Sequence, residues 1–174
     1  MAQTETQHRS AAELMEQDFA YVAAHDVDGI MSLAHEDIVE DFLAVRTLRG
    51  KAEVRAYFEQ IFAATPDLVF EVEEIHEVDD TTAVGQWRMY GTFSGAEFEG
   101  IQPTGRRVDL RGIDVMRLED GLLKHNTIYY DGLSFARQIG MLPADDSPGD
   151  RAMKGLFNGV TTIKRAVQDT LNKR

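Results

Sequence analysis

Two stretches of the chain alternate apolar and polar residues: LVFEVEEIHEVDDTTAVGQWRMYGTFS at residues 68–94 and RVDLRGIDVMRLEDGLLKHNTIYY at residues 107–130. A period of two is typical of β-strands, whose successive side chains point to opposite faces of a sheet. Turn-forming residues divide the stretches at Asp79-Asp80 and Asp120-Gly121, and Pro103-Thr104-Gly105 lies between them. The pattern predicts four strands, at residues 68–78, 82–94, 107–118 and 123–130.

Helical patterns precede these strands. Ser10 and Glu13 have the spacing of a capping box, and apolar residues follow at helical spacing to about residue 24. Asp26 is placed to cap a second, short helix, and a third helix follows Gly50. Helices that come before a run of antiparallel strands, rather than alternating with strands, indicate an α+β fold with helices on one face of a sheet.

Composition excludes several classes of function. The 174 residues are 43% hydrophobic, which suffices for one domain with its own core. The net charge of -12 argues against a nucleic-acid partner, because such binding depends on Lys and Arg. The absence of cysteine excludes disulfides and thiolate chemistry. We find no membrane-spanning run and no secretory signal pattern, so we expect a cytoplasmic protein without membrane contact.

A different kind of segment follows the strands. The sequence PADDSPG at residues 143–149 ends the alternation of apolar and polar residues. From Pro148 onward the chain has six basic and two acidic residues. Apolar residues then recur at helical spacing: Met153, Leu156, Phe157, Val160, Ile163, Val167 and Leu171. We predict a domain at residues 1–142, a linker at 143–149 and an amphipathic helical extension at 150–174. This helix packs on its own domain or on a partner subunit; the alternative is a basic helix lying on a membrane surface.

Short motifs in the strands and loops resemble those of SnoaL-like polyketide cyclases, a branch of the nuclear-transport-factor-2-like superfamily. They are Gly91-Thr92-Phe93-Ser94-Gly95, Phe98-Glu99-Gly100, Pro103-Thr104-Gly105-Arg106, Asp120-Gly121, and Asp131 with Arg137-Gln138-Ile139-Gly140. The resemblance covers residues 10–141. It implies a curved antiparallel sheet wrapped by three helices into a cone, usually dimeric, with a small apolar ligand in the open end. We expect no cofactor, since the chain has no phosphate loop or dinucleotide fingerprint.

Residues 26–41 and 113–117 are also similar to the ketosteroid isomerases of the same superfamily. This second resemblance implies that Asp41 moves a proton at carbon, and that a protonated Asp114 donates a hydrogen bond to the enolate oxygen. The tyrosine that those isomerases carry on their first helix falls nearest to Asp18 here. Tyr21 lies almost one turn later and could reach a similar place.

The residue pattern places Asp18 in the interior, and the resemblance places Asp114 there. Asp18 lies in the apolar stripe of the first helix, where it needs a raised pKa or a hydrogen-bond donor. It is either an acid of the pocket or a structural group bonded to the sheet. Asp114 shares a strand face with Met116, and by resemblance this face lines the cone. Its alternative role is a hydrogen bond that only orders the strand.

Glu40 and Asp41 lie in an extended segment, residues 38–45, so only one of them faces inward. The isomerase resemblance selects Asp41. Without it, a solvated edge residue is the better interpretation of Asp41.

The catalytic positions of the SnoaL-like cyclases are only partly kept. Those enzymes use an Asp on the last strand and a His on the strand before it, and the corresponding residues here are Ile128 and Asp114. Ile128 cannot move a proton, so the cyclase mechanism as that family runs it is in doubt. Limonene epoxide hydrolases also need a carboxylate at this position, which makes an epoxide hydrolase a lesser alternative.

The leading hypothesis is a cofactor-free enzyme that performs acid/base chemistry next to a carbonyl, an isomerisation or cyclisation, on an apolar cyclic or polyketide-like substrate. Asp41 would be the base, with Asp114 and Asp18 as hydrogen-bond donors. The competing hypothesis is a non-catalytic binding protein for a small hydrophobic ligand.

The remaining expectations concern ligand contacts, metals and partners. The residues expected to line the ligand site are Tyr21, Trp87, Arg88, Met116, Asn126, Ile128 and Tyr130. Trp87 is more often a core residue than a ligand platform, and Arg88 could orient a carbonyl. The five histidines, His8, His25, His35, His76 and His125, form no pair at ligand spacing, so we expect no metal site. We expect a homodimer formed through the sheet face or the C-terminal helix.

Overall fold

A computed structural model describes residues 9–172. The helices are α1 (Ala11–Ala23), α2 (Val27–Leu33), α3 (Lys51–Ala64), α4 (Gly132–Gln138) and α5 (Pro148–Leu171). The strands are β1 (Ala34–Phe42), β2 (Arg46–Arg49), β3 (Val69–Asp79), β4 (Thr82–Phe93), β5 (Arg106–Glu119) and β6 (Leu122–Tyr130). The predicted helices and strands follow one another in the predicted order, and a short strand, β2, and a short helix, α4, were not predicted. His8, Lys173 and Arg174 lie outside the described residues.

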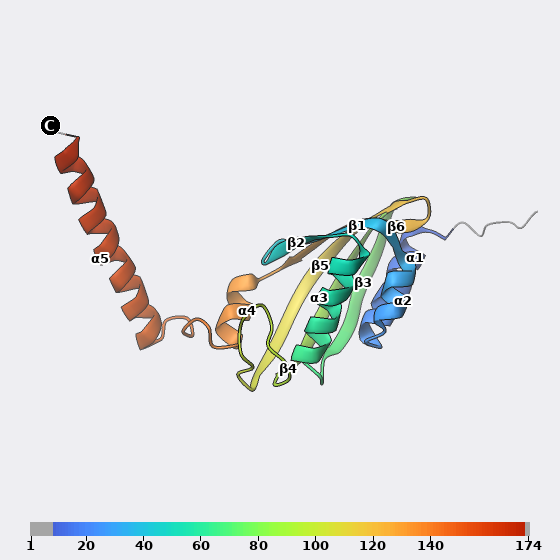
Figure 1. Ribbon diagram of the computed structural model, residues 1–174, viewed down its shortest axis with the longest axis horizontal. Coiled ribbons are helices and arrows are strands. Elements are labelled where there is room, and N and C mark those ends of the chain that lie inside the picture. Colours follow the sequence, from blue (N-terminus) through green and yellow to red (C-terminus); the bar gives the residue numbers. More distant parts are fainter. Residues whose placement is uncertain (1–8, 173–174) are drawn as a thin grey trace, which may run out of the picture.

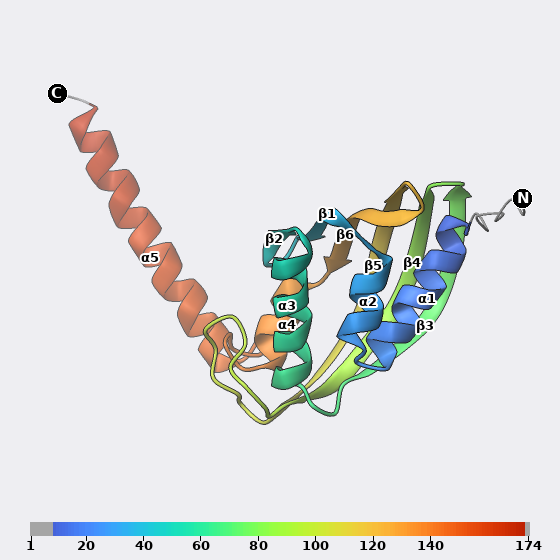
Figure 2. The same cartoon turned by 45° about the vertical axis from the view of Figure 1, so that its right-hand side comes forward.

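The six strands form one curved, open sheet in the order β2-β1-β6-β5-β4-β3. All neighbouring strands are antiparallel except β1 and β6, which are parallel. Helices α1, α2 and α3 lie against one face of this sheet (Figures 1 and 2). The predicted α+β cone is confirmed, with the parallel β1–β6 pair as a difference from a purely antiparallel sheet.

Helix α1 starts and packs as its sequence predicts. Ser10 and Glu13 form both hydrogen bonds of the capping box. The apolar stripe of α1 then packs on the sheet, where Gly85 of β4 leaves it room. A Cβ atom at Gly85 would lie 2.5 Å from both Met15 Sδ and Phe19 Cε2. This glycine therefore lets α1 approach the sheet closely enough to cover the inner end of the cone.

Strand β1 departs from the prediction. It begins at Ala34 rather than at residue 38, and the short strand β2 pairs with it through the turn that follows. Its pairing with β6 shifts register between Ala34 and Val39. This irregularity arises from contact with a strand about 90 residues away in the chain, so local sequence patterns do not show it.

Helix α5 projects away from the cone in both views (Figures 1 and 2). Ser147 caps it and Pro148 is in its first turn, as predicted. Its apolar side chains do not pack on its own domain, since Leu156 and Phe157 are 73% and 71% exposed. Packing of α5 on a partner subunit stays a prediction, and so does its alternative, binding to a membrane surface. The division of the chain into a domain, a linker and an extension at residues 142 and 149 also stays a prediction. No helix among residues 9–172 is long and apolar enough to span a membrane.

Candidate active site

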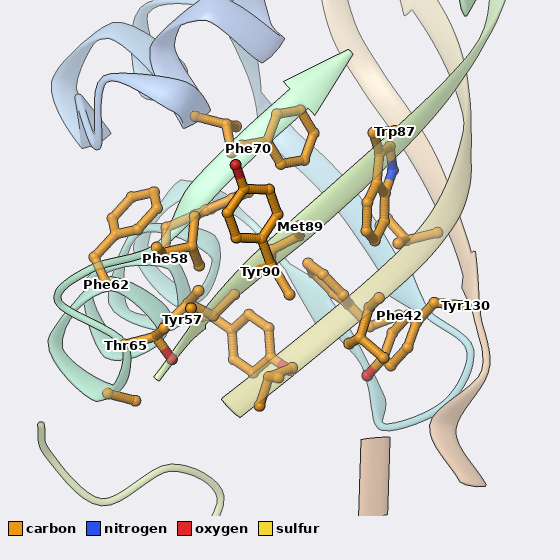
Figure 3. A pocket seen from close by; sticks show the side chains of 18 of the residues that line it. Phe42, Tyr57, Phe58, Phe62, Thr65, Phe70, Trp87, Met89, Tyr90 and Tyr130 are labelled. Atoms are coloured by element: carbon orange, nitrogen blue, oxygen red, sulfur yellow. The ribbon is translucent and has the colours of Figure 1, made fainter. Parts of the chain in front are cut away.

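A cavity lies between the inner face of the sheet and helices α1 and α3. Its volume is about 120 Å³, enough for a small organic molecule rather than a single water. Aromatic rings from α3 and from four strands point into the space (Figure 3): Phe42, Tyr57, Phe58, Phe62, Phe70, Trp87 and Tyr130. The wall of the cavity is therefore largely aromatic.

Three carboxyl groups meet in this aromatic cavity. Asp18 comes from α1, Glu40 from β1 and Asp114 from β5. The three residues are only 4%, 2% and 7% exposed. Buried carboxyl groups this close together need hydrogen bonds or protons to offset the cost of burial.

Two donors hold these groups in place. Trp87 Nε1 donates to Asp114 Oδ1 at 2.7 Å. Asn126 Nδ2 donates to Asp114 Oδ2 at 2.8 Å and to Glu40 Oε2 at 3.1 Å. Asn126 can reach both carboxyls because its strand, β6, lies between β1 and β5. The indole of Trp87 reaches Asp114 across Gly112, where a Cβ atom would lie 2.2 Å from Trp87 Cζ2.

Two acceptor atoms in the same cluster have no hydrogen-bond partner. They are Asp18 Oδ1 and Asn126 Oδ1, and both are buried. Unpaired buried acceptors cost free energy, so a structure keeps them where a proton or a ligand supplies the donor.

The environment separates the pKa values of the three carboxyl groups. Burial raises the pKa of Asp114 to about 6, and hydrogen bonds from Asn126 and Trp87 limit the rise. Burial, and then the charge of Asp114, raise the pKa of Asp18 to about 8. The pKa of Glu40 lies well above its usual range, because of burial and of the charges on Asp18 and Asp114. Near neutral pH, Asp114 is therefore ionised while Asp18 and Glu40 hold protons.

The prediction that Asp41 faces the interior is wrong. Its side chain accepts a hydrogen bond from Thr47 Oγ1 at 2.7 Å beside β2, outside the cavity. Its neighbour Glu40 occupies the interior, and Ile38 and Phe42 share the same side of β1. In the sequence, the alternation of Ile38, Glu40 and Phe42 indicates that Glu40 faces inward. The isomerase resemblance indicates Asp41 instead. The interpretation of Asp41 as an edge residue, from the residues alone, agrees with the structure.

The other predicted ligand contacts fall into two groups. Four of them line the cavity: Trp87, Asn126, Ile128 and Tyr130. Ile128 is paired with Asp114 across β5 and β6, so an apolar side chain occupies the position of the cyclases' catalytic Asp.

Three predicted contacts lie elsewhere. The Arg88 guanidinium binds Asp109 at 2.8 and 2.6 Å, away from the cavity. Met116 is fully buried in the core. Tyr21 lies against Gly29 of α2, and its hydroxyl accepts a hydrogen bond from Gln17. None of these three residues lines the cavity, so the expectation that they do is wrong.

One group of three acidic side chains within residues 9–172 is close enough to hold a metal ion. Asp145, Asp146 and Asp150 place ligand atoms within 4.8 Å of one another before and at the start of α5. Lys154 Nζ lies 2.6 Å from Asp150, and Arg137 Nη2 lies 3.1 Å from Asp145. These two cations offset most of the charge of the three carboxylates. Arg137 of α4 also lies 3.9 Å from Asp150 of α5, so the cluster links the two helices and is not among the residues that line the cavity.

The model of the SnoaL-like domain family matches residues 15–126. This chain belongs to that family. The match begins in α1 and ends in β6, so it includes Asp18, Glu40, Asp114 and Asn126. None of the curated proteins matches this SnoaL-like chain significantly.

Solved structures share the fold. A candidate SnoaL-like polyketide cyclase from Jannaschia sp. CCS1 is 23% identical, with a TM-score of 0.68 over 82% of this chain and 98% of its own. TsrD from Streptomyces laurentii is 27% identical, with a TM-score of 0.65 over 75% of this chain and 94% of its own. AclR, a candidate hydroxylase from Streptomyces galilaeus, is 25% identical, with a TM-score of 0.64 over 75% and 85%. The fold is thus shared by proteins assigned to different reactions.

Proposed function

We propose that this SnoaL-like protein is an enzyme that moves a proton at a carbon atom next to a carbonyl group, without a cofactor. The reaction class is isomerisation or cyclisation of a small, apolar ring compound. The observation that supports it is the convergence of three buried carboxyl groups, with separated pKa values, in an aromatic cavity. Groups whose environments push their pKa values apart are suited to act as an acid and a base in one site.

Asp114 has the properties of the base. It has the lowest pKa of the three, about 6, so it is ionised near neutral pH and can accept a proton from carbon. Each of its oxygens accepts one hydrogen bond, from Trp87 or Asn126, and keeps a further lone pair. The isomerase resemblance assigned to Asp114 the role of a neutral hydrogen-bond donor. In this proposal Asp18 and Glu40 have that role instead.

Asp18 and Glu40 have the properties of the acids. Both hold a proton near neutral pH and can donate a hydrogen bond to the substrate carbonyl as negative charge develops on its oxygen. In the first step the C–H bond breaks, the proton moves to Asp114 and the electron pair forms an enolate. Asp114 then returns the proton to another carbon in an isomerisation. In a cyclisation, the enolate carbon forms a bond to the carbon of a second carbonyl of the same molecule, and the oxygen of that carbonyl takes the proton from Asp114.

The experiment is hydrogen–deuterium exchange on cyclic enones and aromatic β-keto esters in heavy water, followed by NMR. We expect Asp114→Asn to abolish enzyme-dependent exchange and Asp18→Asn to slow it. Asp41→Asn is the matched control, because Asp41 lies next to Glu40 in sequence but outside the cavity. The rate should be bell-shaped in pH, rising near pH 6 as Asp114 ionises and falling near pH 8 as Asp18 loses its proton.

The competing role of a non-catalytic binding protein makes a different prediction. These compounds would then bind, as reported by the fluorescence of the single tryptophan, Trp87, without any exchange above the uncatalysed rate. Binding without exchange across the panel contradicts the enzyme proposal.

A further inference from the structure

We propose that the acidic part of the cavity binds the ammonium group of a lipophilic amine, while the aromatic walls hold its hydrocarbon skeleton. The first argument is the pair of unpartnered acceptors. Asp18 Oδ1 and Asn126 Oδ1 are buried and lack a donor within the protein. An ammonium group brings up to three N–H donors and no acceptor, whereas a carbonyl brings only an acceptor.

The second argument is charge. Three carboxyl groups line the cavity, and none of the residues that line it is Lys, Arg or His. A ligand that carries a carboxylate or phosphate would enter a site of its own sign without a counter-charge. A cation would instead pair with the carboxyl groups in surroundings where water screens little.

The third argument is the aromatic surroundings of the carboxyl groups. Phe70 packs between Phe19 and Trp87, with ring centroids 5.3 and 5.5 Å apart. All three rings line the cavity together with Asp18 and Asp114. The faces of aromatic rings attract cations, and the hydrocarbon part of an amine gains from burial against them.

Binding of a cation would change the protonation of the site. Asp18 on α1 is influenced by Asp114 from β5 and itself influences Glu40 of β1. Tyr57 of α3 and Tyr130 of β6 also line the cavity, but burial raises their pKa values, to about 12 for Tyr130. These phenols stay neutral near pH 8, so a bound ammonium group would draw its counter-charge from the carboxyl groups, which release protons to solvent.

This inference concerns binding and does not depend on the proton transfer proposed above.

The test uses three probes of similar size: cyclohexylamine, cyclohexanol and cyclohexanecarboxylate. Trp87 lies at the site and is the only tryptophan, so its fluorescence reports binding to the full chain. At pH about 8 we expect the amine to bind at least about tenfold more tightly than the alcohol, as expected when hydrogen bonds to a charged group are gained. The carboxylate should bind more weakly than the alcohol. At pH about 5 all three carboxyl groups are protonated, and the preference for the amine should fall below about threefold.

Two variants locate the effect. Asp18→Asn should weaken binding of the amine much more than binding of the alcohol, so that most of the preference for the amine is lost, while Asp41→Asn should behave like the unmodified protein. Calorimetric titration of the amine in two buffers of different ionisation enthalpy should show proton release on binding. Equal affinity for the three probes, or no binding of any of them, overturns the proposal. Proton transfer is judged separately by deuterium exchange, so either result leaves that proposal standing.

Discussion

Replacement of Asp18 by Asn should make the protein more stable, by an amount that increases with pH. The side chain keeps its shape but can no longer ionise inside the cavity. The folded protein holds the Asp18 proton up to a pKa of about 8, against an ordinary value of 3.8 for the unfolded chain. The raised pKa therefore favours folding at low pH, and this contribution is lost as pH rises from about 4 to about 8.

The magnitude follows from the two pKa values. Each pH unit within this window lowers the free energy of unfolding of the unmodified protein, relative to Asp18→Asn, by about 1.4 kcal/mol. The difference between the two proteins should thus grow by about 4 kcal/mol between pH about 4 and pH about 7. It should stop growing above pH about 8, where Asp18 is ionised in both the folded and the unfolded states.

Urea denaturation followed by circular dichroism, at several pH values, measures this difference directly. Titrating groups that do not interact with Asp18 contribute equally to both proteins and cancel. Asp114 and Glu40 interact with Asp18, so their altered titration is part of the measured difference. Asp41→Asn is the control and should show no such pH dependence, because that side chain lies outside the cavity. A constant difference between Asp18→Asn and the unmodified protein across the window would refute the raised pKa and, with it, the role of Asp18 as an acid.

Three further predictions address the supports of the site. Trp87→Phe removes a hydrogen-bond donor to Asp114, so the pKa of Asp114 should rise and the acid limb of the pH profile of deuterium exchange should move above pH 6. Urea denaturation should show a free energy of unfolding lower by about 1–3 kcal/mol. Gly112→Ala places a Cβ 2.2 Å from the Trp87 ring, so we expect the free energy of unfolding in urea to fall by about 1–3 kcal/mol. An unchanged denaturation midpoint would contradict that contact. Arg137→Gln removes a cation that lies 3.9 Å from Asp150, so amide hydrogen exchange should accelerate in the first turn of α5 but not in β4.

The sequence predicted features that depend on residues near one another in the chain. The capping box of Ser10 and Glu13 and the cap at Asp26 involve partners three residues away, and both form as predicted. The alternation of apolar and polar residues within residues 68–130 also relates near neighbours in the chain, and it predicted the four long strands. The apolar neighbours of Asp18 on its helix predict that it lies in the interior. Alternation groups Asp114 with Met116 on one strand face, and the resemblance to the family implies that this face lines the cone.

The choice between Glu40 and Asp41 shows where local patterns stop. Which of two adjacent side chains faces inward depends on the register of β1 against β6, and that register shifts between Ala34 and Val39. The partner residue of Glu40 is Asn126, 86 positions later in the chain. Alternation within β1 favoured Glu40, but only the pairing of the two strands decides it.

The sequence alone determined the helices, the long strands and the interior position of Asp18, because backbone propensity, capping and alternation act over a few residues. The cone and the inward face of Asp114 came from the resemblance of its motifs to the family. Only the tertiary structure decided that Glu40 is the third group, that Trp87 and Asn126 hold Asp114 as the most acidic of the three, and that Arg88, Met116 and Tyr21 lie outside the cavity. Hydrogen bonds, burial and mutual charge set these properties between residues from different elements. Such interactions exist only once the sheet has formed and α1 has covered it.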